Sequence, residues 1–309
     1  MSRTSSRDPS VLERMWRVDA PTPPPRSTGR ARLPACVKAL LRRRLSAYSD
    51  AMSISNEGYP LAAAISPRLH VIDHVDSTNA KLLHDAAEDP DGHPHLSVVL
   101  TRDQRAGRGR LDRVWAAPAG TALAVSVLLR AGAVEVDDRG WIPLVAGAAM
   151  RAAVAAQLPD AEVTLKWPND VLVDGRKISG ILAEVLPSDP HVVVVGVGVN
   201  TTMASAELPI PTATSFADQG ADADEDRLVA DFLVGVRDAI ADLAVGGHEA
   251  VAARVAEDCS TIGREVAVSL PGGETLRGRA VRLDAAGRLV VDAVGVESVV
   301  GAGDVVHVR

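Results

Sequence analysis

The chain has 309 residues, of which 47% are apolar and 24% charged, and its formal net charge is −7. This is the composition of a globular protein long enough for two domains. No stretch reaches the roughly 18–20 uninterrupted apolar residues of a membrane helix, and charges stand where a signal peptide would be apolar, so we expect a cytoplasmic protein. With two distant cysteines, Cys36 and Cys259, the sequence excludes a disulfide framework and a thiol zinc site.

The N-terminal segment differs in charge from the rest of the chain. Residues 1–50 contain eleven Lys/Arg and four Asp/Glu, and residues 1–34 contain six prolines. Because apolar residues are few and irregularly spaced, we predict a disordered, basic, Pro-rich extension over 1–66, with a pattern compatible with a short helix over 37–47. A nucleic-acid-binding tail is the alternative, but the apolar pattern does not provide the further helices of a helix-turn-helix.

From residue 69 onward, the apolar pattern alternates between strand and helix types. Strands are predicted over 69–75, 96–100, 122–129, 171–173, 177–185 and 192–199. Helices are predicted over 78–88, after the N-cap residues Ser77-Thr78-Asn79, and over 141–158, 227–243 and 249–257. Asp174-Gly175 between two strands is typical of a type I′ hairpin. We therefore predict an α/β domain over 67–259.

After Cys259 the pattern consists of short strands separated by glycine-containing turns. They are predicted over 265–270, 274–283, 288–294 and 305–308. About fifty residues of this kind favour a small β-barrel over 260–309.

A segment rich in glycine and arginine is the first candidate for chemistry. It contains Gln104, Gly107-Arg108-Gly109-Arg110, Arg113 and Trp115. Glycines let the backbone approach a ligand, and guanidinium groups bind carboxylates or phosphates through paired hydrogen bonds, so the segment resembles an anion-binding loop. Its glycine spacing is neither that of a Walker loop nor that of a Rossmann fingerprint. Taken alone, an exposed turn is the alternative.

Three further clusters are candidates for a binding site. The first is Lys166-Trp167-Pro168-Asn169-Asp170 with Lys177, which holds two of only four lysines in the chain. A compact ammonium can reach a carboxylate and a phosphate together, although chance and a plain turn are alternatives. The others are Gly196-Val197-Gly198-Val199-Asn200 and Ser77-Thr78-Asn79, for which close strand packing and helix capping are the alternatives. No metal-ligand spacing of histidines and no Gly-x-Ser-x-Gly elbow occurs, which disfavours catalytic zinc and hydrolase chemistry.

In this order, the clusters resemble those of bacterial biotin protein ligases, of the kind without an N-terminal DNA-binding domain. The matching segments, spread over residues 69–309, are Asp76-Ser77-Thr78-Asn79, Gln104 with Gly107-Arg108-Gly109-Arg110, Arg113-x-Trp115, Lys166-Trp167-Pro168-Asn169-Asp170, Lys177-Ile178-Ser179-Gly180-Ile181-Leu182 and Gly196-Val197-Gly198-Val199-Asn200. Any one motif is weak, whereas the ordered set is specific.

The resemblance implies a mixed α/β catalytic domain similar to those of class II aminoacyl-tRNA synthetases and lipoate ligases, followed by an SH3-like barrel. It also implies a reaction in two steps. Biotin and ATP, with Mg²⁺ accompanying the nucleotide, give biotinyl-5′-AMP and pyrophosphate. A lysine of a biotin carboxyl carrier domain of acyl-CoA carboxylases then takes the biotin and releases AMP.

Roles for individual residues follow from the same resemblance. Lys177 and Arg110 are expected to stabilise the charge at the α-phosphate. The residues expected at biotin are Ser77, Thr78, Asn79, Gln104, Gly107, Arg108, Gly109, Arg110 and Lys177. Those expected at the nucleotide are Arg110, Arg113, Trp115, Asn169 and Asn200, with Arg108 assisting at the phosphates. No ligand of the metal is predicted.

Two competing interpretations remain open from the sequence. A lipoate–protein ligase shares the fold and the acyl-adenylate chemistry, although the Gly-Arg-Gly-Arg and Lys-Trp-Pro-Asn-Asp segments favour biotin. A biotin-sensing DNA-binding regulator would use the basic tail, but residues 1–68 show no winged-helix pattern, so nucleic acid is not an expected partner.

Overall fold

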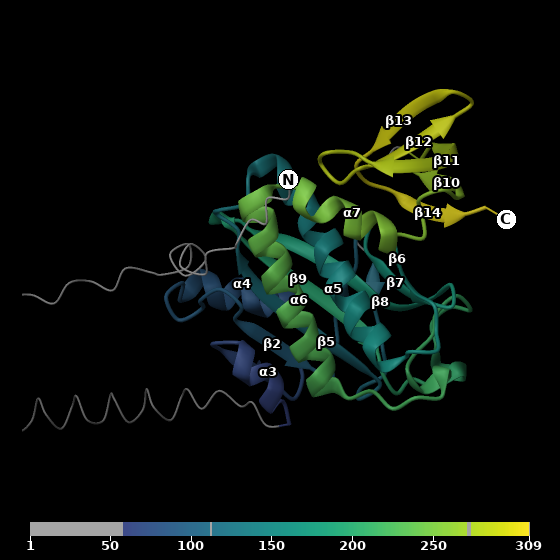
Figure 1. Cartoon of the computed structure of the whole chain (residues 1–309). Coiled ribbons are helices and arrows are strands. Elements are labelled where there is room, and N and C mark those ends of the chain that lie inside the picture. The colour runs from purple at the N-terminus through teal and green to yellow at the C-terminus, as the bar shows by residue number, and fades with distance from the viewer. Residues whose placement is uncertain (1–57, 112, 271–272, 309) are drawn as a thin grey trace, which may run out of the picture. The chain divides into compact units, whose positions relative to one another are not determined.

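The computed structural model describes residues 58–308 except 112, 271 and 272. These residues form a seven-stranded mixed sheet with helices, followed by a C-terminal five-stranded sheet (Figure 1). None of the helices in this part of the chain combines the length and apolar character that a membrane crossing requires. The helix expected over 37–47 lies outside the described residues.

The larger sheet has the strand order β1-β2-β5-β9-β8-β7-β6, with β1 and β2 parallel and the other neighbours antiparallel. Its strands are β1 (Leu69–Val71), β2 (Val98–Thr101), β5 (Ala122–Arg130), β6 (Val163–Lys166), β7 (Asp170–Val173), β8 (Arg176–Leu186) and β9 (Asp189–Asn200). All but β6 were expected, although β1 ends earlier than predicted.

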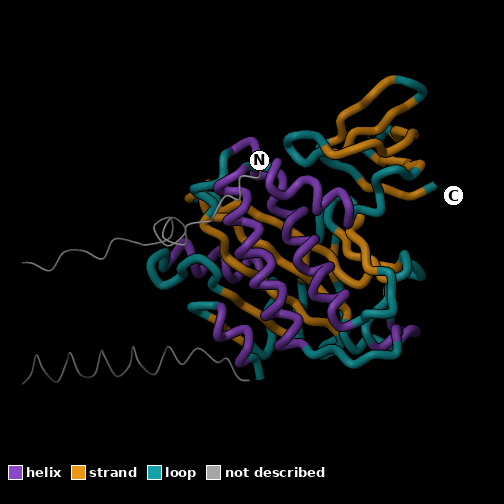
Figure 2. Tube along the Cα trace, in the orientation of Figure 1, coloured by secondary structure: helices purple, strands orange, loops and turns teal. Residues whose placement is uncertain are grey.

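Helices cover this sheet, as Figure 2 shows. They are α3 (Pro60–Ile65), α4 (Thr78–Glu88), α5 (Ile142–Gln157), α6 (Glu225–Gly246) and α7 (Glu249–Asp258), with 3-10 turns η1 (Val136–Trp141), η2 (Ser205–Glu207) and η3 (Ala217–Gln219). Helix α5 packs on β6, β7 and β8 and against α6. Helix α4 buries Leu82 and Ala86 against a cluster that contains Val194. Since side chains alternate along a strand, Gly196 and Gly198 lie on the same sheet face as Val194.

Helix α3 corrects the expectation that residues 1–66 are disordered, because Pro60–Ile65 is a helix. The Tyr59 hydroxyl donates a hydrogen bond to Glu225 at 2.8 Å, and the Ala62 backbone N–H donates to Asp226 at 2.9 Å. Both partners lie more than 160 residues away in the sequence. A local pattern could not show that this short segment is held by α6.

The β7–β8 turn confirms the expected hairpin, since Asp174 and Gly175 both have positive φ, 48° and 75°. The segment 104–115, hereafter the Gly/Arg loop, contains a small ladder that the sequence did not predict. Its strands are β3 (Gly107–Arg108) and β4 (Val114–Trp115), which pair antiparallel.

The C-terminal sheet is antiparallel with the order β13-β12-β11-β10-β14. Its strands are β10 (Glu265–Ser269), β11 (Thr275–Leu283), β12 (Leu289–Ala293), β13 (Val296–Val300) and β14 (Asp304–His307). Strand β13 was not expected, because the prediction continued the preceding strand through Val294. Val294 instead has φ 56° and begins a turn with Gly295, a conformation that valine rarely adopts.

Two buried indoles join the C-terminal sheet to the larger domain. Trp141 Nε1 donates to Ala285 O at 2.8 Å, and Trp167 Nε1 donates to Gly287 O at 3.1 Å. Trp167 therefore anchors the β11–β12 turn. Trp167 also lines the cavity described below, together with residues of β14.

Candidate active site

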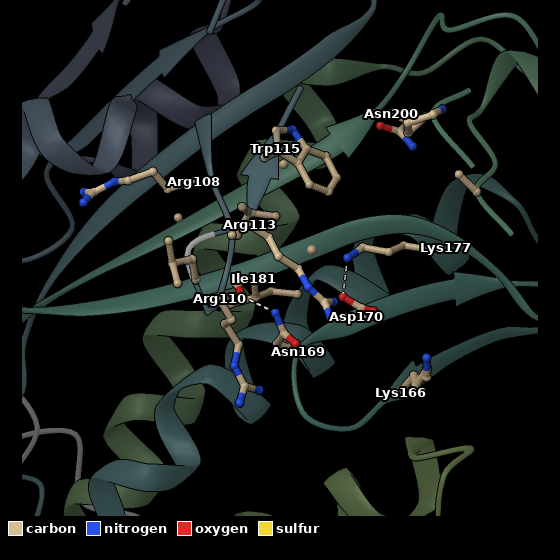
Figure 3. A pocket seen from close by; sticks show the side chains of 18 of the residues that line it. Arg108, Arg110, Arg113, Trp115, Lys166, Asn169, Asp170, Lys177, Ile181 and Asn200 are labelled. Carbon is tan, nitrogen blue, oxygen red and sulfur yellow. Dashed lines mark hydrogen bonds and ion pairs between the residues drawn. The ribbon is translucent and has the colours of Figure 1, made fainter. Parts of the chain in front are cut away.

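A cavity of about 880 Å³ opens on the sheet face that carries Gly196 and Gly198. The size is within the range of small-molecule sites. Its walls come from the N-terminus of α4, the Gly/Arg loop, the β6–β7 turn, strands β8 and β9, residues 209–213 and β14 (Figure 3). The structure brings together all the predicted site residues except Gly107, namely Ser77, Thr78, Asn79, Gln104, Arg108, Gly109, Arg110, Arg113, Trp115, Asn169, Lys177 and Asn200.

Glycines on two paired strands make room for the side chains of the cavity. Gly180 of β8 is opposite Gly198 of β9. A Cβ atom at Gly198 would lie 2.4 Å from the Trp115 ring, and one at Gly196 would lie 2.2 Å from Asn79 Oδ1. Only residues without a side chain allow these approaches. Gly107 has a similar steric role behind the wall, since its Cβ would lie 2.6 Å from Gln104 Nε2.

Lys177 lies at the centre of the charged part of the cavity. Its Nζ is 2.5 Å from Asp170 Oδ1 and 5.5 Å from the centroid of the Trp115 ring (Figure 3). The β7–β8 hairpin sets this geometry, because it places Asp170 and Lys177 on adjacent strands. The ammonium is thus held in one direction, between a carboxylate and an aromatic face.

Two further basic side chains, Arg110 and Lys166, form no hydrogen bond or ion pair with any residue that the structure describes. Burial lowers the pKa of the Arg110 guanidinium, and Asp170 opposes the shift. Burial also lowers the pKa of the Lys166 ammonium, and nearby Lys177 adds to that shift. Partly desolvated cations without a partner form a ready site for an anion.

Two other arginines of the loop that line the cavity, Arg108 and Arg113, are already paired with carboxylates. Arg108 reaches Glu184 of β8, with 3.0 Å between Nη2 and Oε1, and Arg113 is paired with Asp304 of β14. Figure 3 shows Arg108 on the opposite side of the loop from Lys177 and Asp170. Arg108 and Arg113 therefore need a change of partner before they contact a phosphate, whereas Arg110 does not.

Polar groups fill the end of the cavity near α4. Gln104 Oε1 accepts hydrogen bonds from the Thr78 backbone N–H at 2.8 Å and from its hydroxyl at 3.1 Å. The Ser126 hydroxyl donates to Asn79 Oδ1 at 2.6 Å. Ser77 caps α4, because its Oγ accepts from the Ala80 N–H. This end can give a neutral polar ligand several fixed hydrogen bonds.

Two asparagines expected at the nucleotide are bonded to the backbone through their NH₂ groups. Asn169 Nδ2 donates to Ile181 O, and Asn200 Nδ2 donates to Thr214 O, both at 2.8 Å. Neither Oδ1 has a hydrogen-bond partner among the described residues, so each can accept from a ligand donor. Both side chains therefore stabilise the turn or strand end on which they lie, besides lining the cavity.

Several cavity residues were missed by sequence reasoning. Asp170 and Lys166 belonged to a recognised motif but received no role, and Asp304 and His307 come from the C-terminal sheet. Burial lowers the pKa of His307 to about 4, with Lys166 and Arg264 adding to the shift, so this imidazole is neutral at pH 7. No local signal identifies these two residues, because only the folded chain brings β14 to the cavity.

Two family models match the larger domain and the C-terminal sheet separately. The biotin/lipoate A/B protein ligase family matches residues 71–200, and the biotin protein ligase C-terminal domain matches residues 261–308. The biotin–[acetyl-CoA-carboxylase] ligase of Mycobacterium tuberculosis is 43% identical over 247 residues, which are 78% of this chain and 90% of that protein. The chain belongs to the biotin protein ligase family.

More distant relatives agree with this membership. The bifunctional ligase/repressor BirA of Escherichia coli (strain K12) is 30% identical over 198 residues, and the chain spans about half of it, 54%. The biotin protein ligase from Aquifex aeolicus in complex with biotin and ATP has a TM-score of 0.65 at 24% identity, covering 78% of this chain and 99% of that chain. The expected fold, a mixed α/β catalytic domain with an SH3-like C-terminal domain, is confirmed.

Proposed function

We propose that this ligase activates biotin with ATP and transfers it to a lysine of a biotin carboxyl carrier domain. In the first step a carboxylate oxygen of biotin attacks the α-phosphate of ATP, and pyrophosphate leaves. In the second step the amine of the acceptor lysine attacks the carbonyl carbon of biotinyl-5′-AMP, loses a proton and displaces AMP. Family membership and the shape and charge of the cavity together support this assignment.

The observation that carries the proposal is the distribution of charge along the cavity. Five basic side chains and two carboxylates line it, while its α4 end is neutral and polar. A carboxylate and a triphosphate repel each other, so fixed positive charge must hold them together and stabilise the charge that grows on the α-phosphate. We assign Lys177 and Arg110 to that position, with Arg113 at the phosphates.

The neutral end of the cavity suits the ring system of biotin. Thr78, Asn79 and Gln104 supply a few placed polar groups, and apolar residues of the strands surround them. Trp115 would then form an apolar wall beside the adenylate, and Asn169 and Asn200 would contact the nucleotide through their free oxygens. Arg108 would remain at the biotin end with Glu184.

A magnesium ion would accompany the nucleotide. Across the described residues, no group of three or more His, Cys, Asp and Glu side chains could hold a metal ion. The carboxylates that line the cavity, Asp170 and Asp304, could contact an ion that the triphosphate itself carries. When bound there, Mg²⁺ neutralises charge on the phosphate oxygens. The cytoplasmic location stays a prediction from the sequence.

One experiment separates this function from lipoate ligation. The full chain is incubated with ATP and Mg²⁺, and with either biotin or lipoate, and each acyl-adenylate is measured by mass. We expect biotinyl-5′-AMP, and biotinylation when a carrier domain is added. Formation of lipoyl-adenylate alone would assign the chain to lipoate chemistry. The absence of both adenylates would contradict the proposed activity. The DNA-regulator alternative rests on residues 1–50, which lie outside the described part.

A further inference from the structure

Glu184 lies behind the cavity wall and is bonded to two of its residues. It belongs to β8 but does not itself line the cavity. Its Oε2 accepts a hydrogen bond from Asn79 Nδ2 at 2.8 Å, and its Oε1 is 3.0 Å from Arg108 Nη2. One carboxylate thus joins the N-terminus of α4 to the Gly/Arg loop.

The contact with Asn79 determines how that carboxamide is oriented. Asn79 is 4% exposed, and its Nδ2 also donates to Leu182 O at 3.2 Å, while its Oδ1 accepts from Ser126. The NH₂ group and the oxygen of the Asn79 carboxamide therefore both have fixed partners. Gly196, which has no side chain, leaves the space that this carboxamide occupies. Without Glu184 the Nδ2 keeps a weaker bond to Leu182, so the fold survives but the orientation is less restricted.

The contact with Arg108 fixes the Gly/Arg loop at a second point. Gln104, at the start of the loop, is bonded to Thr78, and Arg108 is bonded to Glu184. Both attachments end on the same polar network, which runs from Gln104 through Thr78, Ser126 and Asn79 to Glu184. An exposed ion pair contributes little to stability, so its consequence is expected in loop position rather than in folding.

We propose that Glu184 is a positioning residue that couples the biotin end of the cavity to the Gly/Arg loop through Asn79 and Arg108. This inference rests on the proposed function. Biotin binding to an oriented Asn79 is then linked to a loop held over the cavity, whereas the nucleotide end at Lys177 and Arg110 has no contact with Glu184. Loss of Glu184 should therefore weaken biotin binding selectively and let biotinyl-adenylate escape.

The test compares Glu184→Ala and Glu184→Gln in adenylate formation, with KM measured separately for biotin and ATP. We expect Glu184→Ala to raise the KM for biotin about tenfold, as the loss of a charge-assisted hydrogen bond predicts, with less than a twofold change in the KM for ATP. Glu184→Gln keeps an acceptor for Asn79 and should restore most of the biotin affinity. Free biotinyl-adenylate in solution should increase in both variants.

A control variant and a second pair of variants complete the design. Asp103→Asn removes an ion pair with Arg105 at the start of the same loop, outside the cavity, and should change neither KM. If Glu184→Ala does not fold, it is replaced by Arg108→Gln and by the double variant Arg108→Gln/Glu184→Gln. The double variant should have a KM for biotin no higher than that of the poorer single variant, because the two residues act through one contact.

Two results would overturn the inference. One is an active Glu184→Ala enzyme with an unchanged KM for biotin, and the other is an equal rise of both KM values. If the unmodified chain makes no biotinyl-adenylate, the proposed function fails instead, so the two failures are distinguishable.

Discussion

Lys177 and Asp170 form an ion pair across two neighbouring strands, with 2.5 Å between Nζ and Oδ1. The pair orients the ammonium before any ligand arrives, and Trp115 limits its motion on one side. Under the proposed function, the oriented Lys177 would meet the α-phosphate with the N–H donors that do not face Asp170, which favours electrostatic stabilisation of the transition state.

Replacement of Lys177 tests that role. Lys177→Met should reduce the rate of adenylate formation a few hundred-fold, or about 3–4 kcal/mol, because the lost charge acts mainly in the transition state. Stability should change little, since Asp170 keeps Arg110 and Lys166 nearby. Lys81→Met removes the surface pair with Asp85 and should retain the full rate. A wild-type rate in Lys177→Met would remove this residue from the mechanism.

Ser179 should be replaceable with a gain in stability. Its hydroxyl oxygen is buried without a hydrogen-bond partner among the described residues. Ser179→Ala should raise the free energy of unfolding by about 1 kcal/mol, because the unsatisfied group is removed. The matched variant Ser126→Ala should lower it, since Asn79 Oδ1 then loses its donor. Denaturant unfolding of both variants measures the two changes in the free energy of unfolding. A decrease for Ser179→Ala would show that the Ser179 hydroxyl has a partner.

The N-terminal boundary can be tested by two truncations. A chain that starts at Met52 keeps α3 and should retain the melting temperature and ligase activity of the full chain. A chain that starts at Ser66 lacks α3 and leaves Glu225 and Asp226 without its hydrogen bonds, so it should lose about 1–3 kcal/mol of stability. Loss of activity in the Met52 chain would show that residues before it contribute to the enzyme.

His95 should make stability depend on pH. Burial lowers its pKa to about 4, with the charge of Arg130 adding to the shift. Its neutral Nδ1 accepts the Arg130 backbone N–H at 3.1 Å. The unfolded chain binds a proton near pH 6.5, whereas the folded chain does so near 4, so the stability contribution is complete above 6.5 and is lost as the pH falls toward 4.

The measurement is the free energy of unfolding of the wild type and of His95→Asn between pH 4 and 7.5. Asn keeps an acceptor but does not titrate, so the variant should show a flatter profile, with His307 leaving a residual slope. Identical slopes in the two proteins would exclude His95 as a source of the pH dependence.

The sequence predicted the residues that line the cavity better than the contacts that hold them. The Asp174-Gly175 hairpin between β7 and β8 followed from a local pattern, and so did the strands β8 and β9, whose glycines 180 and 198 face each other. The order of the clusters along the chain is what carried the family resemblance. Glu184 escaped notice because its two partners, Asn79 and Arg108, lie 105 and 76 residues away.

Other differences have the same physical origin. Strand β13 was missed because Val294 favours extended structure locally, whereas the hairpin places it at positive φ. The bond from Trp167 to Gly287 depends on the β11–β12 turn, 120 residues later in the chain. Such contacts are tertiary, so no window of sequence contains both partners.

Attack of the biotin carboxylate on the α-phosphate of ATP can be followed by oxygen labelling. Biotin with ¹⁸O in both carboxyl positions is incubated with the full chain, ATP, Mg²⁺ and a carrier domain, and the masses of the products are measured by mass spectrometry. We expect AMP with one ¹⁸O atom and a biotinylated lysine with the other. Unlabelled AMP, or label in pyrophosphate or phosphate, would contradict it.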